Sequence, residues 1–232
     1  MAKVTLENLN KIFLSKIGKD VKAVNDFNLL LEDGEILALL GSSGCGKTTT
    51  LRMIAGFETA TSGQIKIGER IVNDLKPADR NVAMAFEGYA LYPPLTVKDN
   101  IAFSLMREKI SKDKVDSKVM EVAELLEITD ILERYPPSIS GGQQQRVSLA
   151  RALVRDSDAL LLDEPMSQLE PQLRAVLRAR VKDYIQHNNK TVIFVTHDQT
   201  EAVALADKIA VMEHGDLIQL ASPYEISAKP SN

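Results

Sequence analysis

The chain has 232 residues, of which 44% are hydrophobic and 26% are charged, and its formal net charge is −4. These values are ordinary for a soluble globular protein, and the slightly acidic balance gives no electrostatic reason to expect binding to nucleic acid or an anionic membrane. No apolar stretch reaches the roughly 18 residues of a membrane span, and the N-terminus lacks a signal-peptide core. The single cysteine excludes an internal disulfide framework and favours a reducing compartment.

The N-terminal residues predict two strands. Residues 3–9 alternate apolar and polar side chains, as a half-buried strand does, and residues 21–31 predict a second strand after a polar turn at 16–20. Phe13 precedes this turn, and two interpretations of it stand. It is either a core aromatic residue or a stacking platform for a nucleotide base.

A glycine-rich segment, residues 41–48, follows the apolar run at 36–40 and opens into a helical segment. This order of strand, loop and helix is that of a phosphate-binding P-loop. Its glycines let backbone N–H groups point inward, and the helix that begins near Gly46 adds its positive dipole end. Lys47 can neutralise phosphate charge, and the Thr48 hydroxyl can ligate Mg²⁺. We therefore predict a nucleoside triphosphate bound by Gly41, Ser42, Ser43, Gly44, Cys45, Gly46, Lys47, Thr48 and Thr49.

The next segments predict two more strands, at residues 63–68 and 82–86. The second is continuously apolar, which indicates burial on both faces. It leads through Glu87 into an aromatic and proline-rich loop at residues 89–94, whose apolar groups need a cover. The loop is either a partner surface or packs under the helices that follow.

Residues 96–135 predict a mostly helical subdomain inserted into an α/β core. Thr96 begins a segment that resembles a capping box, and Ser111 can cap a second helix. Apolar side chains recur along that helix at spacings of three and four and form one face: Val115, Val119, Val122, Ala123 and Leu126.

A pair of adjacent glycines starts a helix that runs to about Val154. Ser140 is a natural N-cap with Gln143 three residues later, so a capped helix is the simple interpretation. Gly141 and Gly142 weaken a first helical turn, however. They are better explained if an anionic group approaches the backbone closely.

Two later apolar strands end in polar residues. Asp163 and Glu164 close the segment 158–163, and His197 follows the segment 191–195. Ligands of open α/β sheets lie at the carboxyl ends of strands. This favours a functional role over a purely structural one for all of these side chains. Asp163 suits the coordination shell of Mg²⁺, and Glu164 suits a base that orients and deprotonates a water molecule.

The remaining elements complete the core. Residues 171–187 predict a helix, 208–212 and 217–221 predict strands, and 222–227 predict a short helix. Most arginines of the first helix are expected on a solvated face: Arg174, Arg178 and Arg180.

Taken together, these segments resemble the ATP-binding cassette (ABC) ATPases over almost the whole chain. Residues 41–48 are similar to the family's P-loop, 139–143 to its signature motif and 160–164 to its Walker B strand. Residues 167–170 are similar to the D-loop, and His197 to the switch histidine. This combination, in this order, is highly specific.

Further residues resemble positions of the family and point to one group within it. Glu87 falls at the Q-loop position, and Phe13 falls at the A-loop aromatic, which favours adenine stacking. Residues 89–93, 149–153 and 196–202 are similar to the ATPase subunits of maltose-type sugar and glycerol-phosphate importers.

Several positions depart from the family pattern. Glu87 replaces the usual Q-loop glutamine, Glu170 the usual D-loop aspartate, Ile139 the signature leucine and Pro94 a common histidine. We expect effects on rate and coupling rather than on hydrolysis. The chain also stops at residues 230–232, where sugar-importer ATPases continue, so a C-terminal regulatory domain is expected to be absent, through truncation or because that regulation is lacking.

The resemblance implies an α/β fold with a P-loop NTPase core. That core has a mixed, mainly parallel sheet flanked by helices, an N-terminal antiparallel β subdomain and an inserted helical subdomain. The chain, 1–232, would be a single ABC ATPase domain. Residues 1–86 and 156–232 would form the core, and 87–155 the Q-loop, the helical subdomain and the signature helix.

The resemblance also implies a head-to-tail dimer that sandwiches two ATP molecules. The catalytic residues would be Glu164 and His197, with Mg²⁺ held by Thr48, Asp163 and Glu87. The opposite subunit would contribute Ser140, Gly141, Gly142, Gln143 and Glu170.

The expected function is the energising ATPase of a solute importer, for a carbohydrate or polyol. Its partners would be a second ATPase subunit, identical or different, integral membrane permease subunits and, indirectly, an extracytoplasmic solute-binding protein, at the cytoplasmic face of the plasma (inner) membrane. One alternative is a soluble ABC ATPase acting on DNA or ribosomes, which the acidic balance disfavours. Another is a weakly hydrolysing partner in a heterodimer, suggested by Glu87 and Glu170.

Overall fold

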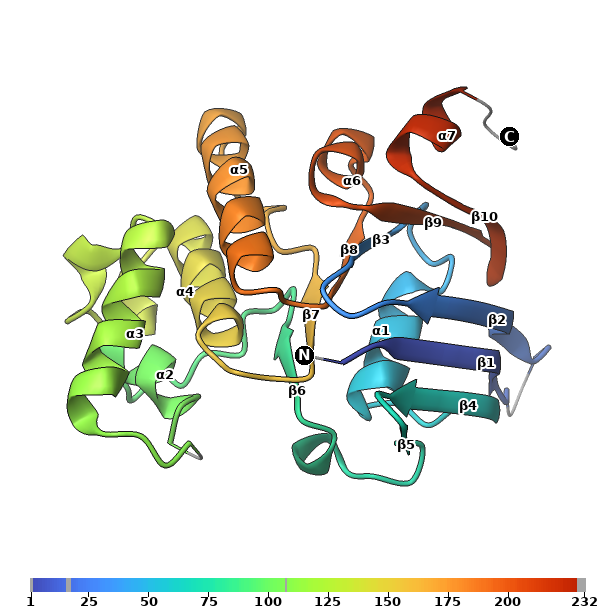
Figure 1. Cartoon of the computed structure of the whole chain (residues 1–232), viewed down its shortest axis with the longest axis horizontal. Helices are drawn as coiled ribbons and strands as arrows, with labels where there is room; N and C mark the ends of the chain where they lie inside the picture. The colour runs from blue at the N-terminus through green and yellow to red at the C-terminus, as the bar shows by residue number, and fades with distance from the viewer. Residues whose placement is uncertain (1, 16–17, 107, 229–232) are drawn as a thin grey trace.

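The computed structural model describes residues 2–15, 18–106 and 108–228. Within these ranges the fold is α/β, with a small antiparallel sheet, a larger mixed sheet and a group of helices on one side of the molecule (Figure 1). Two expectations fall partly or wholly outside the described residues: the turn at 16–20, of which residues 16 and 17 are not described, and the chain end at 230–232.

The small sheet is built by the N-terminal part of the chain. Its strand order is β2-β1-β4-β5, and each neighbouring pair is antiparallel. The strands are β1 (Val4–Phe13), β2 (Val21–Leu31), β4 (Ser62–Ile67) and β5 (Arg70–Ile71). The predicted antiparallel β subdomain is therefore confirmed, although β1 extends beyond the alternating segment to Phe13.

The larger sheet has the order β10-β9-β3-β8-β7-β6. All its described neighbours are parallel except β9 and β10, so the predicted mixed, mainly parallel sheet is confirmed. Its strands are β3 (Ile36–Gly41), β6 (Val82–Ala85), β7 (Ala159–Asp163), β8 (Val192–Thr196), β9 (Lys208–Glu213) and β10 (Asp216–Ala221).

Both faces of the larger sheet are covered, which explains why its strands are apolar runs rather than alternating ones. Leu37 and Leu39 pack into one core with the helix α1 (Lys47–Ala55) and the small sheet. Ile36 and Ala38 pack into a second core on the opposite face. That core includes α4 (Gly141–Leu153), α5 (Pro171–His187) and α6 (Gln199–Leu205).

The helical subdomain lies between β6 and β7 in the chain and contains α2 (Val97–Phe103), α3 (Lys112–Leu125) and α4 (Figure 1). The Thr96 side chain caps α2 by accepting a hydrogen bond from the backbone N–H of Asp99 at 3.0 Å. Ser111 lies at the N-cap position of α3 as expected, with an extended backbone, but its side chain makes no capping hydrogen bond. The expected apolar face of α3 is buried at Val119, Val122, Ala123 and Leu126.

Short elements complete the fold. Pro77–Asp79, Thr129–Ile131 and Pro136–Ser138 form 3₁₀ turns, and α7 is Pro223–Ala228. Among the helices of the described ranges, none combines the length and the apolar character needed to cross a membrane.

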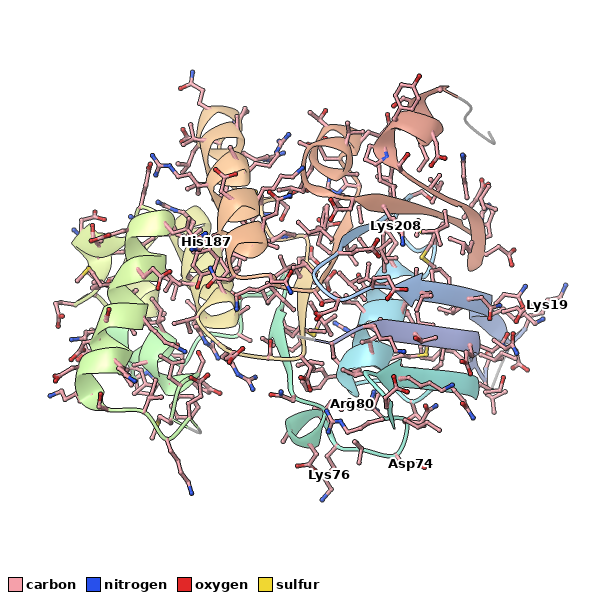
Figure 2. The ribbon with its side chains drawn as sticks, in the orientation of Figure 1. Lys19, Asp74, Lys76, Arg80, His187 and Lys208 are labelled. Atoms are coloured by element: carbon pink, nitrogen blue, oxygen red, sulfur yellow. The ribbon has the colours of Figure 1, made fainter. Side chains whose placement is uncertain are left out.

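A buried arginine joins the end of α1 to the loop that follows β5. Arg80 Nη1 donates to the carbonyls of Met53 and Ile54 at 2.7 and 3.0 Å. Its Nε and Nη2 donate to Leu75 and Asn73 carbonyls at 2.9 Å each. Figure 2 shows Arg80 close to the lower end of α1. The Met53 carbonyl also accepts the Gly56 N–H at 3.2 Å, whereas the guanidinium gives a donor to the Ile54 carbonyl at the helix C-terminus.

We expect Arg80→Met to lower the free energy of unfolding by about 3 kcal/mol, because several buried carbonyls would lose their donor. Urea unfolding followed by circular dichroism measures the change. Arg180→Met is the control: Arg180 is half-exposed and pairs with Glu127 at 2.8 Å, and an exposed pair is worth about 0–1 kcal/mol. Equal losses for the two variants would contradict the role assigned to Arg80.

Candidate functional site

The predicted site residues converge because the strands that carry them are parallel neighbours. The order β3-β8-β7-β6 places the carboxyl ends of these strands at one edge of the larger sheet. Leu40 pairs with Thr196, and Asp163 pairs with Val195, so the strand ends are also in register. The segments that follow each strand are therefore adjacent: residues 41–48, His197, Glu164 and Glu87.

The loop after β3 folds tightly around a buried lysine. Gly46 has a φ of 108°, and a Cβ there would collide with the carbonyl oxygen of Ala23, so glycine is required. Lys47 is only 6% exposed, and its Nζ donates to the carbonyls of Gly41 and Ser42 at 2.8 Å each. An ammonium group is thus fixed within a loop whose backbone leads into the N-terminus of α1, a combination suited to a phosphate group.

Cys45 provides a chemical probe of this loop. Its thiol is buried, and its Sγ lies 3.7 Å from Lys47 Nζ. Alkylation therefore requires the loop to open, and bound phosphate should oppose opening. We expect saturating ATP, at about 100 times its Kd, to slow alkylation up to about a hundredfold, whereas AMP, which lacks the terminal phosphates, should protect weakly. Equal rates with and without ATP, measured by mass spectrometry, would refute the placement of Cys45.

A second group of residues is suited to a magnesium ion. Thr48 Oγ1 donates to Asp163 Oδ1 at 3.0 Å. Asp163 is 3% exposed and forms no ion pair within the described part of the chain. Burial raises the pKa of its carboxyl group, and repulsion from Glu87 and Glu164 adds to the rise. A cation at this point would remove that penalty.

Thr48 and Asp163 fit Mg²⁺ only together with phosphate oxygens and water. Among the described residues, no cluster of three or more acidic, histidine or cysteine side chains could hold a metal ion alone. Magnesium commonly uses one or two carboxylates, substrate phosphates and water as ligands. Glu87 lies on the exposed turn after β6. Its carboxylate repels that of Asp163 electrostatically, without a direct hydrogen bond between the two side chains.

Glu164 and His197 form a pair beside this site. His197 Nδ1 lies 3.1 Å from Glu164 Oε1. The Glu164 backbone is left-handed, with a φ of 48°, and its N–H donates to the Val195 carbonyl of β8 at 3.1 Å. The structure therefore brings the predicted base and the predicted switch histidine together, with the base half-buried and the imidazole largely exposed.

Phe13 lies at the end of β1 and is 41% exposed, so the interpretation as a core residue was wrong. It pairs across the sheet with Val21, the first residue of β2. Two residues further along β2, the carbonyl of Ala23 abuts Gly46. The strand end that carries Phe13 is thus near the P-loop, with Lys11 Nζ 4.7 Å from the centre of its ring. Adenine stacking stays a prediction.

The signature turn begins α4 and is exposed at Ser140 and Gly141. Ser140 Oγ accepts from the Gln143 N–H at 3.3 Å, and Gln143 Oε1 accepts from the Ser140 N–H at 2.9 Å. The capped helix is therefore confirmed. Glu170, the other residue expected at a subunit contact, is exposed at the start of α5.

Two polar side chains near the site were not recognised from the sequence. Arg174, expected on a solvated face, instead donates from Nη2 to the carbonyls of Ser167 and Leu169 at 3.2 and 2.9 Å. Its Nη1 also lies 3.6 Å from Asp198 Oδ2. An arginine in the first turns of a helix opposes the helix dipole, which was an available signal of a specific partner. The second residue is Gln145, a buried side chain of α4.

Comparisons with known proteins agree with this geometry. A family model described as "ABC transporter" matches residues 24–167. The trehalose/maltose import ATP-binding protein MalK of Thermococcus litoralis is 49% identical over 238 aligned residues, covering 100% of this chain and 63% of its own length. The sn-glycerol-3-phosphate import ATP-binding protein UgpC of Brucella abortus is 43% identical and is covered over 65% of its length.

A solved structure shares the fold. The ATP-binding cassette MJ0796, in a dimeric post-hydrolysis state bound to ADP and Pi, matches with a TM-score of 0.87 and 27% identity. The match covers 95% of this chain and 98% of that one. The chain spans less than two thirds of the length of the curated relatives, 63% and 65% for the two described above.

Proposed function

Because this chain belongs to the ABC transporter family, we propose that it is the ATP-binding and ATP-hydrolysing subunit of an importer for a carbohydrate or polyol. The observation that carries the proposal is the meeting of three groups at one sheet edge: the Lys47 loop, the Thr48–Asp163 pair and the Glu164–His197 pair. The names of the similar import proteins, for trehalose/maltose and for sn-glycerol-3-phosphate, support the class of solute.

In this proposal the P-loop holds the phosphates of ATP. Lys47 and the backbone N–H groups of residues 41–49 bind the phosphate oxygens, and Phe13 stacks on the adenine. Thr48 and Asp163 hold Mg²⁺, with Glu87 close enough to influence the charge there. The bound cation would offset negative charge on the phosphates.

Glu164 acts on the attacking water. Its carboxylate accepts a proton from the water as the water oxygen bonds to the γ-phosphorus, and the bond to the β–γ bridging oxygen breaks, giving ADP and phosphate. His197 Nδ1, 3.1 Å from Glu164 Oε1, keeps the carboxylate in one orientation. The same exposed imidazole can contact the γ-phosphate.

We propose a dimer in which the signature turn of one subunit faces the P-loop of the other. The turn, Ser140 to Gln143, is a helix N-terminus that is exposed at Ser140 and Gly141, and it is separate in the chain from the P-loop. The signature turn and the P-loop can therefore approach the same γ-phosphate only from opposite sides. In this arrangement Glu170 lies at the contact between the subunits. The dimeric state of the similar cassette supports this arrangement.

The proposed assembly includes permease subunits and, through them, an extracytoplasmic solute-binding protein, at the cytoplasmic face of the membrane. Within the chain, residues 1–86 and 156–232 are assigned to the core, and 87–155 to the Q-loop, helical subdomain and signature helix. We expect no nucleic-acid partner, since the net charge is −4.

Phosphate release from the purified chain with Mg²⁺ and ATP tests the proposal. Release by the wild type at least about a hundredfold above that of Lys47→Ala supports it. If the chain binds ATP but releases phosphate only after a second ATPase subunit is added, the heterodimer alternative is supported. Isolation of the native complex with nucleic acid or ribosomes, rather than membrane proteins, would overturn the importer.

A further inference from the structure

Gln145 connects the signature helix to the backbone of the proposed catalytic base. The residue lies on α4 and is only 3% exposed. Its Nε2 donates to the Glu164 carbonyl at 2.9 Å and lies 3.1 Å from Ser167 Oγ. Its Oε1 accepts from the Gln168 N–H at 2.9 Å. The primary amide thus spans the turn that follows β7.

The partners of Gln145 fix the orientation of its amide group. A backbone carbonyl only accepts and a backbone N–H only donates, so Nε2 must face Glu164 and Oε1 must face Gln168. Neither a carboxylate nor a hydrocarbon of the same length can make both bonds. The glutamine is therefore required by chemistry and not merely by its size.

The carbonyl that Gln145 holds belongs to a residue with unfavourable backbone geometry. Glu164 has a φ of 48°, a left-handed conformation that costs energy for a residue other than glycine and persists only when its surroundings enforce it. Its N–H is held by Val195 of β8, and its carbonyl by Gln145 and, at 3.2 Å, by Ser167 Oγ. The direction in which the carboxylate leaves the backbone, toward His197, depends on these bonds.

A second contact on the same face of α4 makes the connection stiff. Gly142 lies one turn before Gln145, and a Cβ there would lie 3.2 Å from the Gln168 carbonyl oxygen, tighter than nearly all real contacts. The helix that starts at the exposed Ser140 turn is therefore packed directly on residues 167–169. A shift of that turn has to move the segment that follows Glu164.

We propose that Gln145 is a positioning residue that couples the signature turn to the orientation of Glu164 within the same subunit. The proposal rests on the proposed function and extends it. Contact of the Ser140 turn with the nucleotide of the partner subunit fixes the position of α4. The hydrogen bonds of the Gln145 amide then make the position of the Glu164 backbone depend on that of α4. The two ATP sites of the dimer are linked in this way.

The first test replaces Gln145 by methionine, which has a similar length and lacks both hydrogen bonds. We expect kcat for ATP to fall at least about tenfold while KM for ATP stays within about twofold, since the P-loop is untouched. Gln145→Glu keeps the bond to Gln168 and loses the one to Glu164, so its kcat should fall at least as far. Asn73→Leu is the control, because the Asn73 amide likewise makes two backbone hydrogen bonds, donating to the Gly63 carbonyl and accepting from the Ile65 N–H, but both bonds are to β4 in the small sheet.

A double variant separates positioning from general destabilisation. In a Glu164→Gln background, single-turnover hydrolysis should show no further loss when Gln145→Met is added, since both changes act through one group. The proposal would be overturned by a further tenfold loss in that background or by an unchanged kcat in Gln145→Met. It would also be overturned by a matching loss in Asn73→Leu, or if both Gln145 variants failed to fold. A wild type without ATPase activity would instead refute the proposed function.

Discussion

Replacing Glu164 by glutamine should lower ATP turnover by about two to three orders of magnitude and leave ATP binding intact. Glutamine has nearly the same shape, and its amide can still bond to His197, but it cannot accept the proton of the attacking water. Because the P-loop and the Thr48–Asp163 pair are unchanged, the nucleotide should still bind. Steady-state phosphate release and ATP titration measure the two quantities separately.

The same variant should also accumulate a dimer in the presence of Mg²⁺ and ATP, because the nucleotide joining the subunits is no longer hydrolysed. Size-exclusion chromatography or light scattering detects it. Glu69→Gln is the control, since Glu69 is a highly exposed carboxylate that pairs with Lys3 on the surface, and it should behave as the wild type. Unchanged turnover in Glu164→Gln would remove this residue from the role of base.

The parts of the fold that were predicted correctly are those with a local cause. A strand buried on both faces is a continuous apolar run, and this identified β3, β7 and β8 within one or two residues. Pro171 marked the start of α5, because proline suits the first position of a helix. Since parallel strands end at one edge, the convergence of the P-loop, Glu164 and His197 followed from the strand assignments alone.

Most of the contacts that were missed join segments distant in sequence, and those of Arg174 to Ser167 and Leu169 are the local exception. The Gln145 amide meets Glu164 and Gln168, 19 and 23 residues away, and neither contact has a periodic pattern. Arg174 is polar and helical, so a solvated face was the reasonable expectation, yet it turns back onto the loop before its own helix. Arg80 likewise serves carbonyls of a helix 26 residues earlier. Such partners are set by the tertiary packing, which composition and periodicity do not encode.

Removal of the Lys47 ammonium group should remove most of the stabilisation that ATP gives to this protein. At an ATP concentration 100 times its Kd, the wild type should gain about 2.7 kcal/mol in free energy of unfolding. In Lys47→Ala, a hundredfold weaker Kd would reduce this gain to about 0.4 kcal/mol at the same concentration. Thermal or urea unfolding with and without Mg²⁺ and ATP measures the difference.

The structure gives a physical reason for so large an effect. Lys47 Nζ donates to the carbonyls of Gly41 and Ser42, so alanine removes both a phosphate-neutralising charge and the clamp that keeps the loop closed. Lys66→Ala is the matched control, because its ammonium group pairs with Glu7 at 2.7 Å in the small sheet, away from the P-loop. That variant should keep the full gain with ATP. If Lys47→Ala kept it as well, the phosphates would be bound elsewhere, and the site built around the loop of residues 41–48 would have to be abandoned.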